Sequence, residues 1–260
     1  MPEGDTLFRT AAGLRPYLVG RDVVAARAQG PGPVPQIQRV VGKRVDAVES
    51  QGKNLLIRFD GGLELRTHLR MNGSWHRYRP GERWRRPPGR ARLVLEVDGS
   101  VAVCFDAPVV ELFETRAEPL HPSLSRLGPD LLSPDFDAAE ACRRLRAPER
   151  QAMTISEALL DQRALAGIGN IWRNETLFAE RVDPCAPVRE LDDATLDRLI
   201  ATARRLLTQS AGVAPGRTST KVYRRAGRPC PRCGTVIRSA PLSGEVPRTT
   251  YWCPSCQGGS

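Results

Sequence analysis

The chain has 260 residues, of which 40% are hydrophobic, and its 39 basic against 29 acidic residues give a net charge of +10. This length fits one large domain or two to three small ones, and no apolar run approaches the ~20 residues of a membrane-spanning helix. The positive charge favours a polyanionic partner such as nucleic acid, although a generally basic surface without a specific partner would have the same composition.

The first residues, Met-Pro-Glu-Gly-Asp, carry acids and no apolar core, unlike a signal peptide, so we expect a cytoplasmic protein. Removal of Met1 would expose Pro2 as a secondary amine, which attacks a sugar anomeric carbon and gives a cationic iminium. Glu3 is next to it and could move protons at the same centre. Taken alone, however, Met1-Pro2 is more simply an ordinary chain start.

Residues 1–118 are predicted to form a β-sandwich or barrel with one helix packed on it. Apolar residues at helical spacing predict that helix over residues 6–18. The strands are predicted at 54–60, 63–68, 92–98 and 101–106, with Gly-Gly and Asp-Gly turns between them. The segment 77–92 is rich in Arg, Pro and Gly and predicts an exposed basic loop.

A proline-rich linker at about 118–134 leads into a helical region. Apolar residues at a period of 3.6 predict helices at 136–145, 154–164, 171–180 and 191–210. Gly167 and Gly169 allow a sharp turn between two of these helices, and Asn170 is predicted to be the N-cap of the second. A helix amino terminus beside a glycine turn suits a phosphate, but an ordinary helix pair without a ligand fits the pattern equally well.

Four of the seven cysteines form two pairs near the C-terminus. Cys230 and Cys233 are separated by 19 residues from Cys253 and Cys256, which is the spacing of a four-cysteine zinc site. Two disulfides or a redox motif are the alternative. A closed shell of four thiolates predicts a structural Zn²⁺, and the many arginines nearby suggest a nucleic-acid contact. The single cysteines are expected to be reduced and buried; they are Cys104, Cys142 and Cys185.

Several motifs, in order along nearly the whole chain, resemble the formamidopyrimidine-DNA glycosylase and endonuclease VIII family. They are Pro2-Glu3-Gly4, Gln51-Gly-Lys53-Asn-Leu-Leu-Ile, His68-Leu-Arg-Met-Asn-Gly73, Leu160-Asp-Gln-Arg-Ala-Leu-Ala-Gly-Ile-Gly-Asn170 and Pro247-Arg-Thr-Thr-Tyr-Trp-Cys-Pro-Ser-Cys-Gln257. The resemblance implies an α+β multidomain fold with DNA in the cleft between its parts. We expect an N-terminal catalytic β-sandwich with an N-terminal helix (1–118), a helix–two-turns–helix domain (119–219) and a C-terminal zinc-finger β-hairpin (220–260).

The resemblance also implies roles for individual residues. Pro2 matches the Schiff-base nucleophile that attacks C1′ of the damaged nucleotide, and Glu3 matches the proton donor near the sugar oxygen. Lys53 resembles a catalytic or phosphate-binding lysine; a surface lysine at a strand end is the alternative. Asn170 and Arg248 match residues that grip the phosphates flanking the lesion.

Met71 resembles a residue that wedges into the duplex when the target base flips out, with a core methionine as the alternative. The start Met-Pro-Glu-Gly-Asp-Thr is more similar to endonuclease VIII than to the purine-oriented branch, which starts Met-Pro-Glu-Leu-Pro. That branch also has a loop Asp-Pro-Arg-Arg-Phe-Gly with two further wedges, where this chain has Asp106-Ala-Pro-Val-Val-Glu-Leu. These differences favour oxidised pyrimidines, abasic sites or damage in single strands.

We therefore expect a bifunctional DNA glycosylase and abasic-site lyase of base excision repair, which acts by β,δ-elimination through a Pro2 Schiff base. The expected partner is damaged double-stranded or single-stranded DNA and not a membrane. The protein is expected to be a monomer in the bacterial cytoplasm, associated with the nucleoid. The alternatives are a non-catalytic damaged-DNA-binding protein on the same scaffold and a purine-specific formamidopyrimidine or 8-oxoguanine glycosylase.

Overall fold

The structure is a computed structural model that describes residues 2–31, 33–213, 219–242 and 248–258. Met1 and Pro247, which belong to the motifs above, lie outside these residues. The chain forms two compact units, residues 1–126 and 127–260. Across the described ranges, every helix is too short or too polar to span a bilayer.

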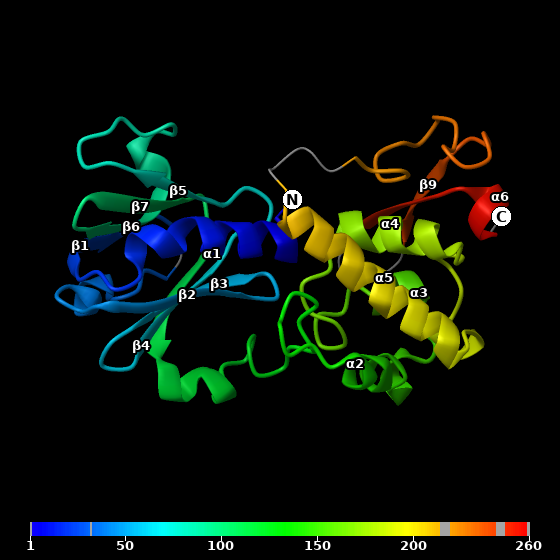
Figure 1. Cartoon of the computed structure of the whole chain (residues 1–260), viewed down its shortest axis with the longest axis horizontal. Coiled ribbons are helices and arrows are strands. Elements are labelled where there is room, and N and C mark those ends of the chain that lie inside the picture. The colour runs from blue at the N-terminus through cyan, green and yellow to red at the C-terminus, as the bar shows by residue number, and fades with distance from the viewer. Residues whose placement is uncertain (1, 32, 214–218, 243–247, 259–260) are drawn as a thin grey trace. The chain divides into compact units, whose positions relative to one another are not determined.

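The N-terminal unit is built on two four-stranded antiparallel sheets (Figure 1). One sheet has the order β1-β6-β7-β5 and the other β2-β3-β4-β8. The strands are β1 (Val23–Ala28), β2 (Val45–Gln51), β3 (Asn54–Phe59), β4 (Leu63–His68), β5 (Ser74–Tyr78), β6 (Ala91–Val97), β7 (Ser100–Phe105) and β8 (Val109–Glu114). The predicted β-sandwich is confirmed, and the four strands expected from the sequence are β3, β4, β6 and β7.

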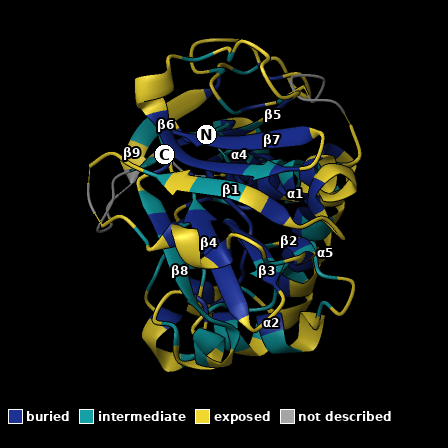
Figure 2. Ribbon diagram, turned by 90° about the vertical axis from the view of Figure 1, so that its left-hand side faces the viewer, coloured by how far each residue is buried: buried dark blue, intermediate teal, exposed yellow. Residues whose placement is uncertain are grey.

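Helix α1 (Gly4–Leu18) packs on this sandwich and begins two residues before the predicted start. Leu7, Ala11, Leu14 and Leu18 lie on one face of the helix because they are three or four residues apart. All four are buried in the same core as residues of both sheets, such as Leu55 and Leu95. Figure 2 shows most of β4 and β7 in dark blue and many of the connecting loops in yellow.

The C-terminal unit begins with four helices, α2 (Ala138–Leu145), α3 (Ile155–Ala158), α4 (Asn170–Glu180) and α5 (Asp193–Ala211). The prediction of one helix over 154–164 was wrong, because α3 is a single turn. Thr154 starts it with a capping box that includes Glu157. The chain then turns at Asp161, whose carboxylate accepts hydrogen bonds from Arg150 and from the backbone of Arg163. Such side-chain bonds compete with continued helix.

The cysteine-rich end forms a hairpin of β9 (Arg238–Leu242) and β10 (Arg248–Trp252), followed by the short helix α6 (Pro254–Gln257). Its small core contains Val222, Ile237 and Cys253 together with Phe178 of α4. Short 3₁₀ turns complete the secondary structure: η1 (Ile37–Val40), η2 (Pro88–Arg90), η3 (Thr115–Leu120), η4 (Pro148–Arg150) and η5 (Val188–Glu190).

Of the three single cysteines, only Cys104 is fully buried as predicted, within β7. Cys142 is half-buried on α2, and Cys185 is exposed, so the prediction was wrong for Cys185. Cys185 directly precedes Ala186, whose carbonyl accepts the Ile155 amide, so the backbone here serves α3 while the thiol points to solvent.

Candidate functional site

The amino terminus is fixed by the start of α1. Glu3 is the N-cap residue, and its carbonyl accepts hydrogen bonds from the amides of Thr6 (3.0 Å) and Leu7 (3.2 Å). The Glu3 residue is only 1% exposed, whereas Pro2 is half-buried. Because α1 packs on β2 and β3, the first residues belong to the same unit as the hairpin that carries Lys53.

Lys53 lies in the tight turn between β2 and β3, where Gly52 has a φ of 58°. A positive φ at this position is typical of two-residue hairpin turns and favours glycine. The turn is braced by Asn54, whose Nδ2 donates to the carbonyl of Gln51 at 3.0 Å. Its Oδ1 accepts from Nε of the buried Arg66 at 2.9 Å. Lys53 is therefore held on an ordered turn and is itself half-buried.

His68 adds a polar group that the sequence analysis did not single out. It ends β4 and pairs with Asn54 across the ladder, next to the Lys53 turn. Burial, together with the charges of Arg66, Lys53 and Arg70, lowers the pKa of His68 to about 4. The imidazole is therefore neutral at neutral pH, among three cations. Its place in the motif His68-Leu-Arg-Met-Asn-Gly was the available sequence clue.

Met71 is 54% exposed, so the alternative that it is a core methionine is wrong. Its loop is closed tightly, because the Gly73 amide donates to the Leu69 carbonyl at 2.9 Å. A Cβ on Gly73 would lie 2.6 Å from that same carbonyl oxygen, a distance that real Cβ atoms do not reach. Arg70 has a φ of 46° within this loop. Met71 thus projects from a tightly folded loop.

Arg86 ties this loop to the loop after β7. Its Nη1 donates to the carbonyl of Asn72 at 3.2 Å and also binds the carboxylate of Asp106. Asp106 has a φ of 54° and also accepts from Arg90 Nε at 2.8 Å. Asp106 begins the segment that stands in place of the purine branch's wedge loop, and here it is a structural anchor for two arginines.

In the C-terminal unit, Asn170 is the first residue of α4, and Gly169 is its N-cap, so the predicted N-cap was wrong by one residue. The Asn170 side chain is used in tertiary contacts instead. Its Nδ2 donates to the carbonyl of Thr249 at 3.1 Å, and its Oδ1 accepts from Arg173 Nη2 at 2.6 Å. Because Thr249 follows Arg248 in β10, the structure brings Asn170 and Arg248 to the same place.

Two buried side chains of α4 support this junction, and the sequence analysis named neither. Arg173, 1% exposed, donates to the Thr250 hydroxyl at 2.8 Å. Asn174, 0% exposed, donates to the carbonyl of Asn170 at 2.6 Å and accepts from the Tyr251 amide at 2.8 Å. No local sequence pattern indicates contacts between α4 and a strand more than seventy residues later.

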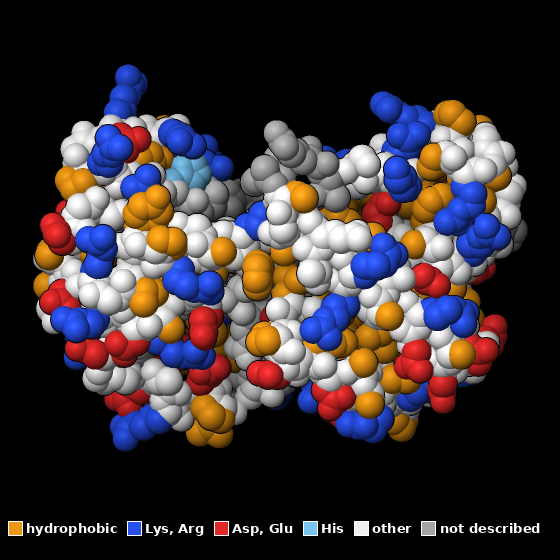
Figure 3. Space-filling view, in the orientation of Figure 1, with side chains coloured by type: hydrophobic (Ala, Val, Ile, Leu, Met, Phe, Trp, Pro, Cys, Tyr) orange, Lys and Arg blue, Asp and Glu red, His pale blue; other side chains and the backbone are white. Residues whose placement is uncertain are grey.

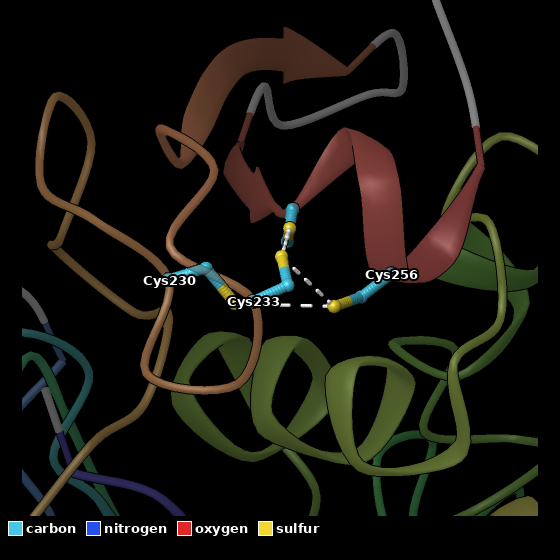
Figure 4. A group of neighbouring side chains, drawn as sticks. Cys230, Cys233 and Cys256 are labelled. Carbon is cyan, nitrogen blue, oxygen red and sulfur yellow. Dashed lines mark hydrogen bonds between the residues drawn. The ribbon is translucent and has the colours of Figure 1, made fainter.

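The four paired cysteines converge, and the Sγ atoms of Cys230, Cys233, Cys253 and Cys256 all lie within 4.8 Å of one another (Figure 4). Three Sγ–Sγ distances are 3.4, 3.4 and 3.9 Å. A tetrahedron with Zn–S bonds of ~2.3 Å has edges of about 3.8 Å, so the cluster fits a four-thiolate metal site. Two separate disulfides do not explain this mutual convergence.

The cysteine cluster is fastened to the carboxyl end of α4. Arg232, between the first two cysteines, donates to the carbonyls of Phe178 (3.0 Å) and Ala179 (3.4 Å). A cation at this end also interacts favourably with the helix dipole. Gln257 donates to the Val182 carbonyl at 3.0 Å. Arg232 is therefore engaged in packing, although the arginine-rich composition suggested a nucleic-acid contact.

Comparison with known proteins agrees with this arrangement. Residues 1–108 match the formamidopyrimidine-DNA glycosylase N-terminal domain, and residues 127–223 match the H2TH domain of the same glycosylases. The chain is 41% identical to a probable endonuclease 8 of Streptomyces coelicolor, covering 100% of this chain and 95% of that protein. It is 39% identical to a DNA-(apurinic or apyrimidinic site) lyase of Mycolicibacterium smegmatis, with 100% of each chain covered.

Solved structures show the same fold. The MutM (FPG) protein of Thermus thermophilus superposes with a TM-score of 0.83 at 30% identity, over 100% of both chains. The Lactococcus lactis formamidopyrimidine-DNA glycosylase, bound non-covalently to DNA with an abasic site, superposes with a TM-score of 0.85. That pair is 22% identical and covers 99% of this chain and 100% of the other.

Proposed function

Because the chain belongs to the family of formamidopyrimidine-DNA glycosylases and endonuclease 8, we propose that it is a bifunctional DNA glycosylase and abasic-site lyase of base excision repair. The observation that carries the proposal is the start of the chain: Pro2 and Glu3 directly precede α1, which packs on the hairpin whose turn holds Lys53. A non-catalytic DNA-binding protein would have no need for these three residues together.

In the proposed mechanism, Met1 is removed and the Pro2 nitrogen attacks C1′ of the damaged nucleotide. The new N–C1′ bond forms as the glycosidic bond breaks, and the base leaves with a proton. Glu3 protonates the sugar ring oxygen as the base departs, so the ring opens in the same step and an iminium remains between Pro2 and C1′. Lys53 holds the adjacent phosphate or assists proton transfer.

The iminium acts as an electron sink for strand cleavage. Loss of a proton from C2′ expels the 3′ phosphate, and loss of the C4′ proton then expels the 5′ phosphate. Water then hydrolyses the iminium and regenerates the Pro2 amine.

We assign DNA-binding residues within each unit. We assign Asn170 and Arg248 to the phosphates flanking the lesion, because α4 and β10 bring them together. Met71, exposed at the tip of its tightly closed loop, fills the space left by the flipped base. The net charge of +10 supports largely sequence-independent binding that weakens with salt.

We assign Zn²⁺ to the four-cysteine cluster, where its role is structural because four thiolates leave no open coordination position. When bound, the ion fixes the hairpin that presents Arg248. The metal takes no part in the reaction at Pro2.

We favour oxidised pyrimidines as substrates. The relatives named endonuclease 8 support this choice, and so does the replacement of the purine branch's wedge loop by a segment whose Asp106 is occupied by Arg86 and Arg90. We further propose that the enzyme works as a monomer on the bacterial nucleoid.

Borohydride trapping on DNA with an abasic site tests the mechanism. Protein shown by mass spectrometry to lack Met1 should form a covalent adduct, and Pro2→Ala should not. Glu3→Gln is the matched control at the neighbouring position, since it keeps the amine and should still be trapped while it loses base excision. Full cleavage by Pro2→Ala would overturn the assignment of the nucleophile, and preference for 8-oxoguanine opposite cytosine would overturn the choice of substrate.

A further inference from the structure

A groove of about 760 Å³ lies on the N-terminal unit and is lined mainly by the loop that joins β5 to β6. Its walls include Arg27, Arg83, Trp84, Arg85 and Arg86. This volume is comparable with sites of ~300–1,000 Å³ that take small ligands. Figure 3 shows several Lys and Arg side chains at the upper left of the view, where Figure 1 places the loop between β5 and β6. None of the functional roles assigned above uses this groove.

The aromatic side of the groove is firmly built. The half-buried Trp84 stacks on the buried Tyr78, with ring centroids 6.1 Å apart and planes at 28°. It also meets the edge of the buried Phe105 at 5.8 Å. The Arg85 amide donates to the Tyr78 hydroxyl at 3.0 Å, which anchors the loop beside the indole. The indole is thereby fixed in the groove wall.

The charge of the groove is strongly unbalanced. Arg83 and Arg85 are exposed, and within the described residues neither has a carboxylate at ion-pair distance. Arg27 pairs with Glu96 at 3.8 Å, and its guanidinium lies 5.6 Å from the centre of the Trp84 ring. The one acidic wall residue, Glu82, accepts a hydrogen bond from the Arg79 amide at the neck of the loop. An anionic ligand would therefore gain from several cations.

We propose that this groove binds single-stranded DNA as a second site, separate from the catalytic site. Arginines around an aromatic ring match the two repeating parts of a single strand: phosphates pair with cations, and unpaired bases stack on aromatic faces. Duplex DNA buries its base faces in its own stack and offers the indole nothing to stack on.

The groove begins next to the Met71 loop. Arg86 lines it and also donates to the carbonyl of Asn72 at 3.2 Å. A strand that leaves the neighbourhood of Met71 can therefore continue over Arg86 toward Trp84. The site suits an unpaired segment beside the lesion, as in a bubble or a replication fork. This last point rests on the proposed function, whereas single-strand binding by the groove does not.

The test isolates the groove from the catalytic site. The full-length enzyme is saturated with a short duplex that carries a tetrahydrofuran abasic analogue. A dye-labelled oligothymidylate of ~12 nucleotides, within the ~4–16 nucleotides that single-strand-binding domains cover, is then titrated by fluorescence anisotropy. Trp84→Leu should weaken this binding by about fivefold or more, the lower end of the loss measured for one base stack.

The double variant Arg83→Ala/Arg85→Ala should weaken binding and make its salt dependence shallower by about 0.7 for each phosphate that the protein no longer neutralises. Arg79→Ala is the matched control, because Arg79 is exposed on the same loop but does not line the groove. Unchanged oligonucleotide binding in the Trp84 and arginine variants would overturn the proposal. So would equal competition by undamaged duplex, or a Trp84 variant that binds normally while the arginine variant does not.

Borohydride trapping keeps this proposal separate from the mechanism. The groove variants should be trapped on a short abasic duplex as efficiently as the wild type, and Pro2→Ala should bind the oligonucleotide normally. Wild-type enzyme that binds the oligonucleotide but is never trapped would remove the proposed chemistry and leave the groove assignment intact.

Discussion

Asn174→Ala should loosen the packing of β10 on α4 and weaken DNA binding without touching the proposed chemistry. The side chain is fully buried. Its Nδ2 donates to the Asn170 carbonyl at 2.6 Å and to Asn170 Oδ1 at 3.3 Å, and its Oδ1 accepts from the Tyr251 amide at 2.8 Å. The substitution takes this partner from the Tyr251 amide and from the Asn170 side chain, whereas the Asn170 carbonyl keeps its place in the helical ladder of α4. At ~1–2 kcal/mol for each broken hydrogen bond, the unit should be destabilised by about 2–4 kcal/mol.

The same change should be visible in DNA binding. With β10 loosened, Arg248 no longer holds its phosphate, and the slope of log affinity against log salt should become shallower by about 0.9. Thermal unfolding and salt-dependent binding to an abasic-analogue duplex measure the two effects. Thr176→Val is the matched control, because Thr176 is equally buried on α4 and no described residue bonds its hydroxyl. If Asn174→Ala keeps the wild-type stability and salt slope, the junction does not position Arg248.

Three further changes test other parts of the structure. Gly73→Ala places a Cβ 2.6 Å from the Leu69 carbonyl oxygen, so it should disturb the Met71 loop. A fluorescent base analogue in the DNA should then report poorer base flipping. Cleavage of a preformed abasic site should persist. Glu64 is fully buried, and this burial raises the pKa of its carboxyl group from 4.5 to about 7. Its contribution to the free energy of unfolding is therefore complete below about pH 4.5 and is lost as the pH rises through about 7. Glu64→Gln should therefore gain stability relative to wild type in urea unfolding between about pH 5 and about pH 8, and a constant difference would contradict this titration. Removal of the metal, or Cys233→Ser, should release β10 and abolish tight DNA binding. Mass spectrometry measures the zinc content, and fluorescence anisotropy measures the DNA binding. Metal-free protein that binds DNA normally would refute the structural role of the metal.

Much of this architecture was predictable from local patterns. The strands β3, β4, β6 and β7 were predicted because they combine apolar residues with glycine turns on short spacing. The cysteine spacing alone predicted the cluster. Two Cys-x2-Cys pairs with 19 residues between them are typical of a site in which four thiolates bind one zinc ion. By contrast, β1 and β8 were not predicted, and each pairs with a strand distant in sequence, as Ala26 of β1 pairs with Leu95 of β6.

The residues that hold the site together were not predictable, because their roles exist only in three dimensions. Asn174 and Arg173 are ordinary polar residues within a helical pattern, and their partners lie on a strand made much later in the chain. His68 acquires its neutral state from burial and from cations on three different segments. The end of α3 depends on Asp161 and its two arginines, whereas the apolar periodicity continued past it.

The attachment of Arg232 to the end of α4 also has a consequence for biosynthesis. Domains generally fold as units during translation, and α4 leaves the ribosome well before Cys253 and Cys256 are made. Until Arg232 is made, the carbonyls of Phe178 and Ala179 lack their arginine, and until β10 is made, Asn174 lacks the Tyr251 amide. A chain that stops before β10 would therefore carry Pro2 without the strand that holds Arg248, and it should bind abasic DNA more weakly than the finished protein.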